Sequence, residues 1–140
     1  MDPAIKPGLR HTQTFRVTQA QTVPALSGVF GRKDDMPPVL ATAYMIGFIE
    51  WTCLDSLRAH LAATERTLGT HVDVSHAAAT PIGMMVTAEV ELVEVQGRRL
   101  RFRVLCRDDA DVISEGFHER TLVDAGKFLA RLDAKTPGAG

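Results

Sequence analysis

The chain has 140 residues, which suits one domain with one hydrophobic core, so we treat residues 1–140 as a single domain. Hydrophobic residues make up 45% and charged residues 24%, an ordinary composition for a soluble globular protein. The formal net charge of -1 excludes the basic surface that binding to nucleic acid or to a membrane surface needs. The N-terminus has no signal-peptide pattern, and Cys53 and Cys106 form no metal or redox motif. We therefore expect a reduced, cytoplasmic protein.

The first elements are a strand and a long loop. Residues 12–18 are rich in residues that favour β-structure, and they predict the first strand. Residues 19–38 contain several prolines and glycines and predict a loop. Loops of this length in a compact domain are usually covers over a functional site or disordered. The apolar residues of this loop, including Phe30 and Met36, favour a cover that packs on the rest of the protein.

A long helix is predicted over residues 41–61, with Thr42 at its cap or in its first turn. Its first half is apolar on all sides, so we expect it to be buried all round. Between Met36 and Leu54 the only charged residue is Glu50. A buried carboxylate is costly unless it is partnered or has a raised pKa, and proteins keep one mostly where chemistry needs it. Alternatively, Glu50 lies at the edge of the helix or pairs with an arginine.

The alternation of residues 68–78 predicts a strand. Val72, Val74 and His76 share a face that we expect to look inward, whereas His71 and Asp73 point outward. His76 should therefore point towards the core and the helix. A metal site built from these histidines and Asp73 is disfavoured, because the strand sends His71 and His76 to opposite faces.

Residues 84–94 and 100–107 predict two long strands that form a hairpin, each with alternating apolar residues facing inward. A three-residue loop, with Gly97 in the left-handed conformation, pairs Glu94 with Arg98 and keeps the apolar faces matched. In that register Glu91 lies opposite Arg101, so the arginines are read as members of cross-strand charge pairs rather than as ligand-binding groups.

The last strand is predicted over residues 112–123, with His118 and Arg120 on one face, and a short helix over residues 124–132 closes the chain. Arg120 can serve a ligand or neutralise a buried carboxylate. One strand, a long apolar helix and four further antiparallel strands indicate an α+β hotdog fold, in which a five-stranded antiparallel sheet wraps around a long central helix. The open edge and open apolar face of so small a sheet predict a homodimer.

Four residues form a candidate site on this fold. A hydroxyl (Thr42), a carboxylate (Glu50) and an imidazole (His76) can converge, with Glu50 as nucleophile or general base and His76 transferring protons. Gly69 would let a substrate carbonyl approach a backbone N–H. Each also has a structural explanation: a cap, a helix edge, a core histidine and a strand bulge. No phosphate loop, dinucleotide fingerprint or nucleophilic-serine motif is present, and we expect neither a cofactor nor a metal.

Four segments resemble the fluoroacetyl-CoA thioesterase family of hotdog proteins: VLATAYMIGFIEW (39–51), LGTHVDVSHAAATP (68–81), EVQGRRL (94–100) and GFHER (116–120). The resemblance covers nearly the whole chain. It implies hydrolysis of a short acyl-CoA thioester by Thr42, Glu50 and His76, with Gly69 by the thioester carbonyl and Arg120 lining the site.

The resemblance also implies that the loop before the helix is a lid that carries phenylalanines in the family. This chain has Lys33 and Met36 at the corresponding positions, with Phe30 nearby. The departure affects selectivity for the fluoroacetyl group more than thioester hydrolysis, because Met36 still fills apolar space. The alternatives are a general short-chain thioesterase, a non-catalytic acyl-CoA-binding module, and a different hotdog enzyme such as an enoyl-CoA hydratase.

Overall fold

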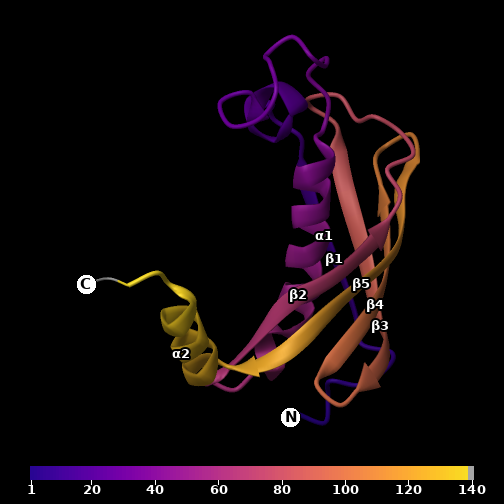
Figure 1. Cartoon of the computed structure of the whole chain (residues 1–140). Helices are drawn as coiled ribbons and strands as arrows, with labels where there is room; N and C mark the ends of the chain where they lie inside the picture. Colours follow the sequence, from indigo (N-terminus) through magenta and orange to yellow (C-terminus); the bar gives the residue numbers. More distant parts are fainter. Residues whose placement is uncertain (139–140) are drawn as a thin grey trace.

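The long apolar segment and the alternating segments form one helix inside one curled sheet (Figure 1). The computed structural model describes residues 1–138; residues 139 and 140, the end of the small-residue tail, lie outside the described residues. The sheet has five antiparallel strands in the order β1-β3-β4-β5-β2. Their bounds are Arg10–Arg16 (β1), Glu65–Val74 (β2), Met85–Gln96 (β3), Arg99–Arg107 (β4) and Val112–Asp124 (β5). The sheet wraps around helix α1 (Thr42–Leu57), so the predicted hotdog fold is confirmed.

The core lies between the inner face of the sheet and one side of α1. The alternate residues of β3 and β4 that were predicted to face inward are buried: Val86, Ala88, Val90, Leu92, Leu100, Phe102, Val104 and Cys106. Met45, Ile49 and Cys53 of α1 are buried against them. Their four-residue spacing places these side chains along one stripe of the helix.

The opposite side of α1 is open, so the expectation that its first half is buried all round is wrong for a single chain. Tyr44 is 40% exposed and Trp51 is 57% exposed. A sheet of five strands curls only part of the way around a helix, and the stripe that it misses remains apolar. Thr42 is the first residue of α1, and its hydroxyl does not cap the helix.

The hairpin between β3 and β4 uses a tighter turn than predicted. Gln96 pairs with Arg99, so Gly97 and Arg98 form the turn, and Gly97 has the predicted left-handed conformation with φ +62°. The register shifts between Leu92 and Glu94, where Val93 is the extra residue of a bulge. The bulge restores the match between the apolar faces that a two-residue turn alone would break.

The bulge also changes the charge pairs on the outer face. The predicted pairing of Glu91 with Arg101 is wrong, because Glu91 lies opposite Arg103, with 3.2 Å between carboxylate and guanidinium. Arg101 instead pairs with Glu119 of β5 at 2.8 Å. The interpretation of these arginines as members of cross-strand charge pairs is confirmed, with different partners.

The strand predicted over residues 68–78 is shifted towards the N-terminus, since β2 ends at Val74. His76 therefore lies in the segment after the strand. The inward valine face is only partly correct: Val74 packs on the core, whereas Val72 is 36% exposed. The alternation is interrupted because the pairing of β2 with β5 shifts between Gly69 and His71.

The terminal elements also differ slightly from the prediction. The first strand begins and ends two residues earlier than expected, at Arg10–Arg16. The loop before α1 is confirmed, and it contains two short 3-10 turns, Gln19–Gln21 and Val23–Leu26. Helix α2 (Ala125–Lys135) is capped by the Asp124 carboxylate and extends from the end of the molecule remote from this loop (Figure 1). No helix within residues 1–138 is long and apolar enough to cross a membrane.

Candidate active site

The Glu50 carboxylate lies directly against Gly69. Glu50 extends from the middle of α1 towards β2, the strand at one edge of the sheet. A Cβ atom added to Gly69 would lie 2.5 Å from Glu50 Oε1, 3.2 Å from His118 Cε1 and 3.4 Å from Arg120 Nη1. Because Gly69 has no side chain, a carboxylate, an imidazole and a guanidinium from two different elements can converge at this position.

Glu50 is not enclosed by this chain alone. Its side chain is 39% exposed, so in a single chain Glu50 is not the buried carboxylate of the first interpretation but lies at the open edge of the helix, as the alternative allowed. The reason is the same open stripe of α1 that exposes Trp51. Among residues 1–138, no lysine or arginine nitrogen lies within 4.0 Å of the carboxylate, and His118 Nε2 lies 3.9 Å from Oε1.

His118 and Arg120 form a buried polar pair on the inner face of β5. Arg120 donates from Nε to the Thr67 hydroxyl at 2.9 Å and from Nη2 to the Thr67 carbonyl at 2.8 Å. Arg120 Nη1 lies 3.1 Å from His118 Nε2, and His118 Nδ1 lies 2.8 Å from the His71 carbonyl. Burial lowers the pKa of Arg120, but a guanidinium has so high an ordinary pKa that it stays charged at neutral pH. Arg120 therefore brings a fixed positive charge close to Glu50.

Thr42 and His76 form the second polar group of the site. Thr42 Oγ1 and His76 Nδ1 lie 2.7 Å apart, so the predicted meeting of hydroxyl and imidazole is confirmed. The other ring nitrogen, His76 Nε2, is buried and has no hydrogen-bond partner in the part of the chain that the structure describes. Burial lowers the pKa of His76, which keeps the ring neutral at pH 7. A neutral imidazole with one unpaired nitrogen is suited to proton transfer.

Within one chain the two groups are separate. Thr42 and Glu50 are two helical turns apart, about 12 Å along the axis of α1. The predicted convergence of Thr42, Glu50 and His76 is therefore only half present in a single chain: Thr42 meets His76, and Glu50 meets Gly69.

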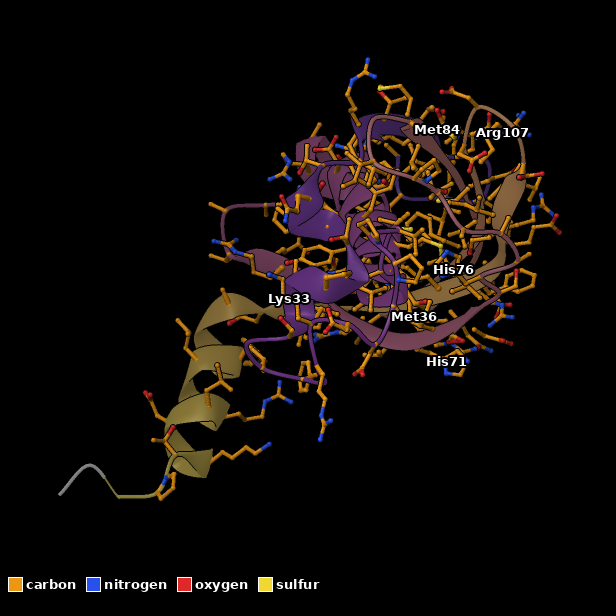
Figure 2. All side chains as sticks on the ribbon, turned by 90° about the horizontal axis from the view of Figure 1, so that it is seen from above. Lys33, Met36, His71, His76, Met84 and Arg107 are labelled. Carbon is orange, nitrogen blue, oxygen red and sulfur yellow. The ribbon has the colours of Figure 1, made fainter. Side chains whose placement is uncertain are left out.

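The loop predicted to be a lid lies over the N-terminal end of α1. Viewed from above, Lys33 and Met36 belong to this loop, and Met36 is on the side nearer His76 (Figure 2). Phe30 is 70% exposed and Met36 is 47% exposed, so both apolar side chains are accessible to a bound molecule. Their role in lining a pocket stays a prediction.

Cys53, one turn after Glu50, is no candidate nucleophile. It is fully buried, and burial raises the pKa of its thiol well above the ordinary value. Sequence reasoning missed the contacts of Thr67 and gave His118 no role. The alternation of both strands could have indicated these residues, because Thr67 lies on the same strand face as Gly69, and His118 on the same face as Arg120.

A long helix wrapped by a curled antiparallel sheet, with a helix carboxylate against a strand glycine, defines a hotdog-fold protein of the thioesterase type. The chain belongs to the fluoroacetyl-CoA-specific thioesterase family, FlK, whose sequence model matches residues 17–126. It is 39% identical over 137 residues to the fluoroacetyl-CoA thioesterase of Streptantibioticus cattleyicolor, a match that covers 98% of this chain and 99% of that protein.

Solved structures agree with this assignment. A mutant of FlK in complex with fluoroacetate superposes with a TM-score of 0.89 at 39% identity, over 94% of this chain and 99% of that one. A thioesterase-superfamily protein of Thermus thermophilus superposes with a TM-score of 0.82 at 25% identity, over 94% of this chain and 95% of that one. The fold and family implied by the sequence resemblance are thereby confirmed.

Proposed function

We propose that this protein hydrolyses short-chain acyl-CoA thioesters, with Thr42, Glu50 and His76 as its catalytic residues. The observation that carries the proposal is the Glu50 carboxylate held against Gly69 beside the buried guanidinium of Arg120. The relatives named as fluoroacetyl-CoA thioesterases support the substrate class. In this proposal Gly69 and Arg120 contact the thioester, and Phe30 and Met36 of the loop contact the acyl group.

Two chemical routes fit these residues. In the first, Glu50 attacks the thioester carbon, the carbon–sulfur bond breaks to leave a mixed anhydride, and water hydrolyses the anhydride. In the second, Glu50 takes a proton from water, and the hydroxide attacks the same carbon. In both, the proton that water gives up is proposed to pass to the neutral His76 and from it to the departing CoA thiolate. The backbone N–H of Gly69 and the charge of Arg120 are the proposed stabilisers of the oxyanion.

The test is release of free thiol from acetyl-, propionyl- and fluoroacetyl-CoA at equal concentrations, measured with a thiol-reactive dye. We expect hydrolysis of all three, with the fluoroacetyl thioester fastest, because fluorine withdraws electrons from the carbonyl. Equal rates on the three substrates indicate a general short-chain thioesterase, in which Lys33 and Met36 do not support fluoroacetyl selectivity. Binding of acyl-CoA without thiol release contradicts the proposal and favours a non-catalytic binding module.

We also propose that the protein is a homodimer whose site is completed by the second copy. Strand β2 is an open edge, and the stripe of α1 with Tyr44 and Trp51 is exposed and apolar. A two-fold axis that pairs β2 with its copy sets the two α1 helices antiparallel on one side of a continuous sheet. The N-terminal end of one helix then faces the middle of the other. This arrangement brings the unpaired Nε2 of His76 in one copy towards Glu50 of the other.

Co-expression of two inactive variants, Glu50→Gln and His76→Ala, tests this arrangement. A mixed dimer has one intact site, assembled from Glu50 of one chain and His76 of the other. Random pairing should therefore restore about a quarter of the wild-type turnover. Each variant alone is the control, and sedimentation measures the oligomeric state. A monomeric protein contradicts the dimer, and a dimer without recovered turnover contradicts the shared site.

Two further proposals concern the whole chain. We propose that residues 1–140 act as one thioesterase domain, which is supported by the single curled sheet and single core found within residues 1–138. We also propose a cytoplasmic location, which is supported by two cysteines that are both free and buried. Burial raises the pKa of Cys106 to about 12, so this thiol is unreactive.

A further inference from the structure

We propose that His118 is a positioning residue, whose Nε2 fixes the guanidinium of Arg120 beside Glu50 and whose Nδ1 fixes the bulge of β2 next to Gly69. The sequence resemblance gives His118 no role, and the proposal comes from its contacts. Its kinetic consequence rests on the proposed function, whereas its structural part can be tested without turnover.

The contacts of His118 determine its tautomer. A backbone carbonyl only accepts hydrogen bonds, so the Nδ1 that lies 2.8 Å from the His71 carbonyl must carry the proton. A guanidinium only donates, so the Nε2 that lies 3.1 Å from Arg120 Nη1 must be an unprotonated acceptor. The ring is therefore neutral. Burial holds the pKa of His118 below its ordinary value, against the opposing effect of the bond to His71.

A neutral ring excludes two other roles for His118. It forms no ion pair with Glu50, although the two groups are 3.9 Å apart, since both facing atoms are acceptors. Nor is it available as a general base, because its lone pair is occupied by Arg120 and the side chain is fully buried.

The hydrogen bond to His118 completes the set of contacts that hold the Arg120 guanidinium in place. Thr67 holds Nε and Nη2 of the guanidinium, and His118 holds Nη1. A planar group bound at all three nitrogens has one orientation. In this orientation Nη1 is 3.4 Å from the position of a Cβ atom on Gly69, the same position that Glu50 Oε1 approaches to 2.5 Å. Loss of the acceptor frees the one nitrogen of Arg120 that borders the proposed thioester site.

The second nitrogen links the same ring to the strand that carries Gly69. The register of β2 against β5 shifts between Gly69 and His71, and the His71 carbonyl at this bulge accepts the Nδ1 proton. One imidazole therefore sets the position of Arg120 relative to the backbone at Gly69. Displacements of about 1 Å in such a constellation can cost ~10²-fold in rate.

Two substitutions separate the functions of the two nitrogens. His118→Asn places an amide donor near the Nδ1 position and removes the acceptor at the Nε2 position. His118→Gln places an amide oxygen near the Nε2 position and removes the donor to His71. We expect His118→Asn to lower kcat by ten- to a hundredfold, with KM changed by about threefold or less, and His118→Gln to recover much of that loss. Ser114→Ala, at another buried polar residue of β5, is the matched control and should leave kcat unchanged.

A double-mutant cycle distinguishes positioning from a general loss of stability. In the Arg120→Met background, His118→Asn should cause no further loss of kcat, because the group that it positions is absent. Losses that multiply, or a kcat for His118→Asn within threefold of wild type, overturn the positioning of Arg120. The proposal is also overturned if the loss of kcat in each of the two His118 variants merely parallels the fall in its unfolding temperature.

An NMR measurement tests the structure independently of activity. The ring nitrogens of His118 should show a protonated Nδ1 and an unprotonated Nε2 throughout pH 6–8, and the Nε2 resonance should shift in Arg120→Met. A protonated Nε2 overturns the proposal. If this tautomer is found in a protein that releases no thiol, the proposed function fails and the hydrogen-bonded arrangement stands.

Discussion

Replacement of Glu50 by glutamine should lower kcat for acyl-CoA hydrolysis by at least about a hundredfold. The amide has nearly the same shape, so it still fits against Gly69, but it can neither attack the thioester carbon nor take a proton from water. KM should change little, because the groups proposed to contact the substrate are unaltered. The measurement is steady-state thiol release, together with the affinity of the variant for an unreactive acyl-CoA analogue.

The matched control for this substitution is Glu115→Gln, an exposed glutamate on the outer face of β5. It removes the same charge from the protein without touching Gly69 or Arg120, and turnover should stay at the wild-type level. Turnover of Glu50→Gln within tenfold of wild type contradicts a catalytic carboxylate and leaves Glu50 with a structural role. A variant that no longer binds the analogue places Glu50 in substrate binding.

Replacement of His76 by alanine should also lower kcat by about a hundredfold or more. The substitution removes the buried Nε2, which has no hydrogen-bond partner among residues 1–138, and it removes the hydrogen-bond partner of Thr42 at 2.7 Å. The unfolding temperature should change only modestly, because His76 lies after β2 and outside the sheet. His60→Ala, in the short 3-10 turn that follows the C-terminal end of α1, is the control for loss of an imidazole and should keep wild-type turnover.

The pH profile gives this prediction a second readout. Burial lowers the folded-state pKa of His76 below 6.5, so its protonation, and the loss of the neutral form, occur below that pH. Wild-type turnover should therefore be constant from pH 8 to pH 7 and should fall on acidification below 6.5. The residual turnover of His76→Ala should lack the part of the acid limb that His76 causes. An unchanged profile together with near-normal turnover contradicts proton transfer by His76.

The alternation in the sequence was sufficient to predict which hairpin residues face inward, but not which residues pair across the hairpin. Val86 and Phe102 face inward as predicted, because strand periodicity follows from backbone geometry alone. The bulge at Val93 was not predictable, since it results from competition between turn geometry and the matching of two apolar faces. The sequence therefore predicted cross-strand charge pairs correctly and assigned them the wrong partners.

The residues of the site likewise fall into those that the sequence could predict and those that it could not. The isolated carboxylate of Glu50, the glycine at position 69 and the contact of Thr42 with His76 could all be inferred from spacing and residue type. His118 could not, because its role depends on which atoms meet its two nitrogens, and these come from β2 and β5. Strand pairing brings residues some fifty positions apart into contact, and a local sequence pattern cannot predict such contacts.

The sequence by itself determined the fold class and the residue types of the site, because periodicity and turn chemistry are local properties. The family followed from the resemblance of four segments to known proteins. Only the tertiary structure decided which groups share a hydrogen bond and which remain open. It separated Glu50 from the Thr42–His76 pair along the helix and left one stripe of α1 exposed. Burial and pairing depend on how far the sheet curls around the helix, and this is set by long-range packing that no single segment specifies.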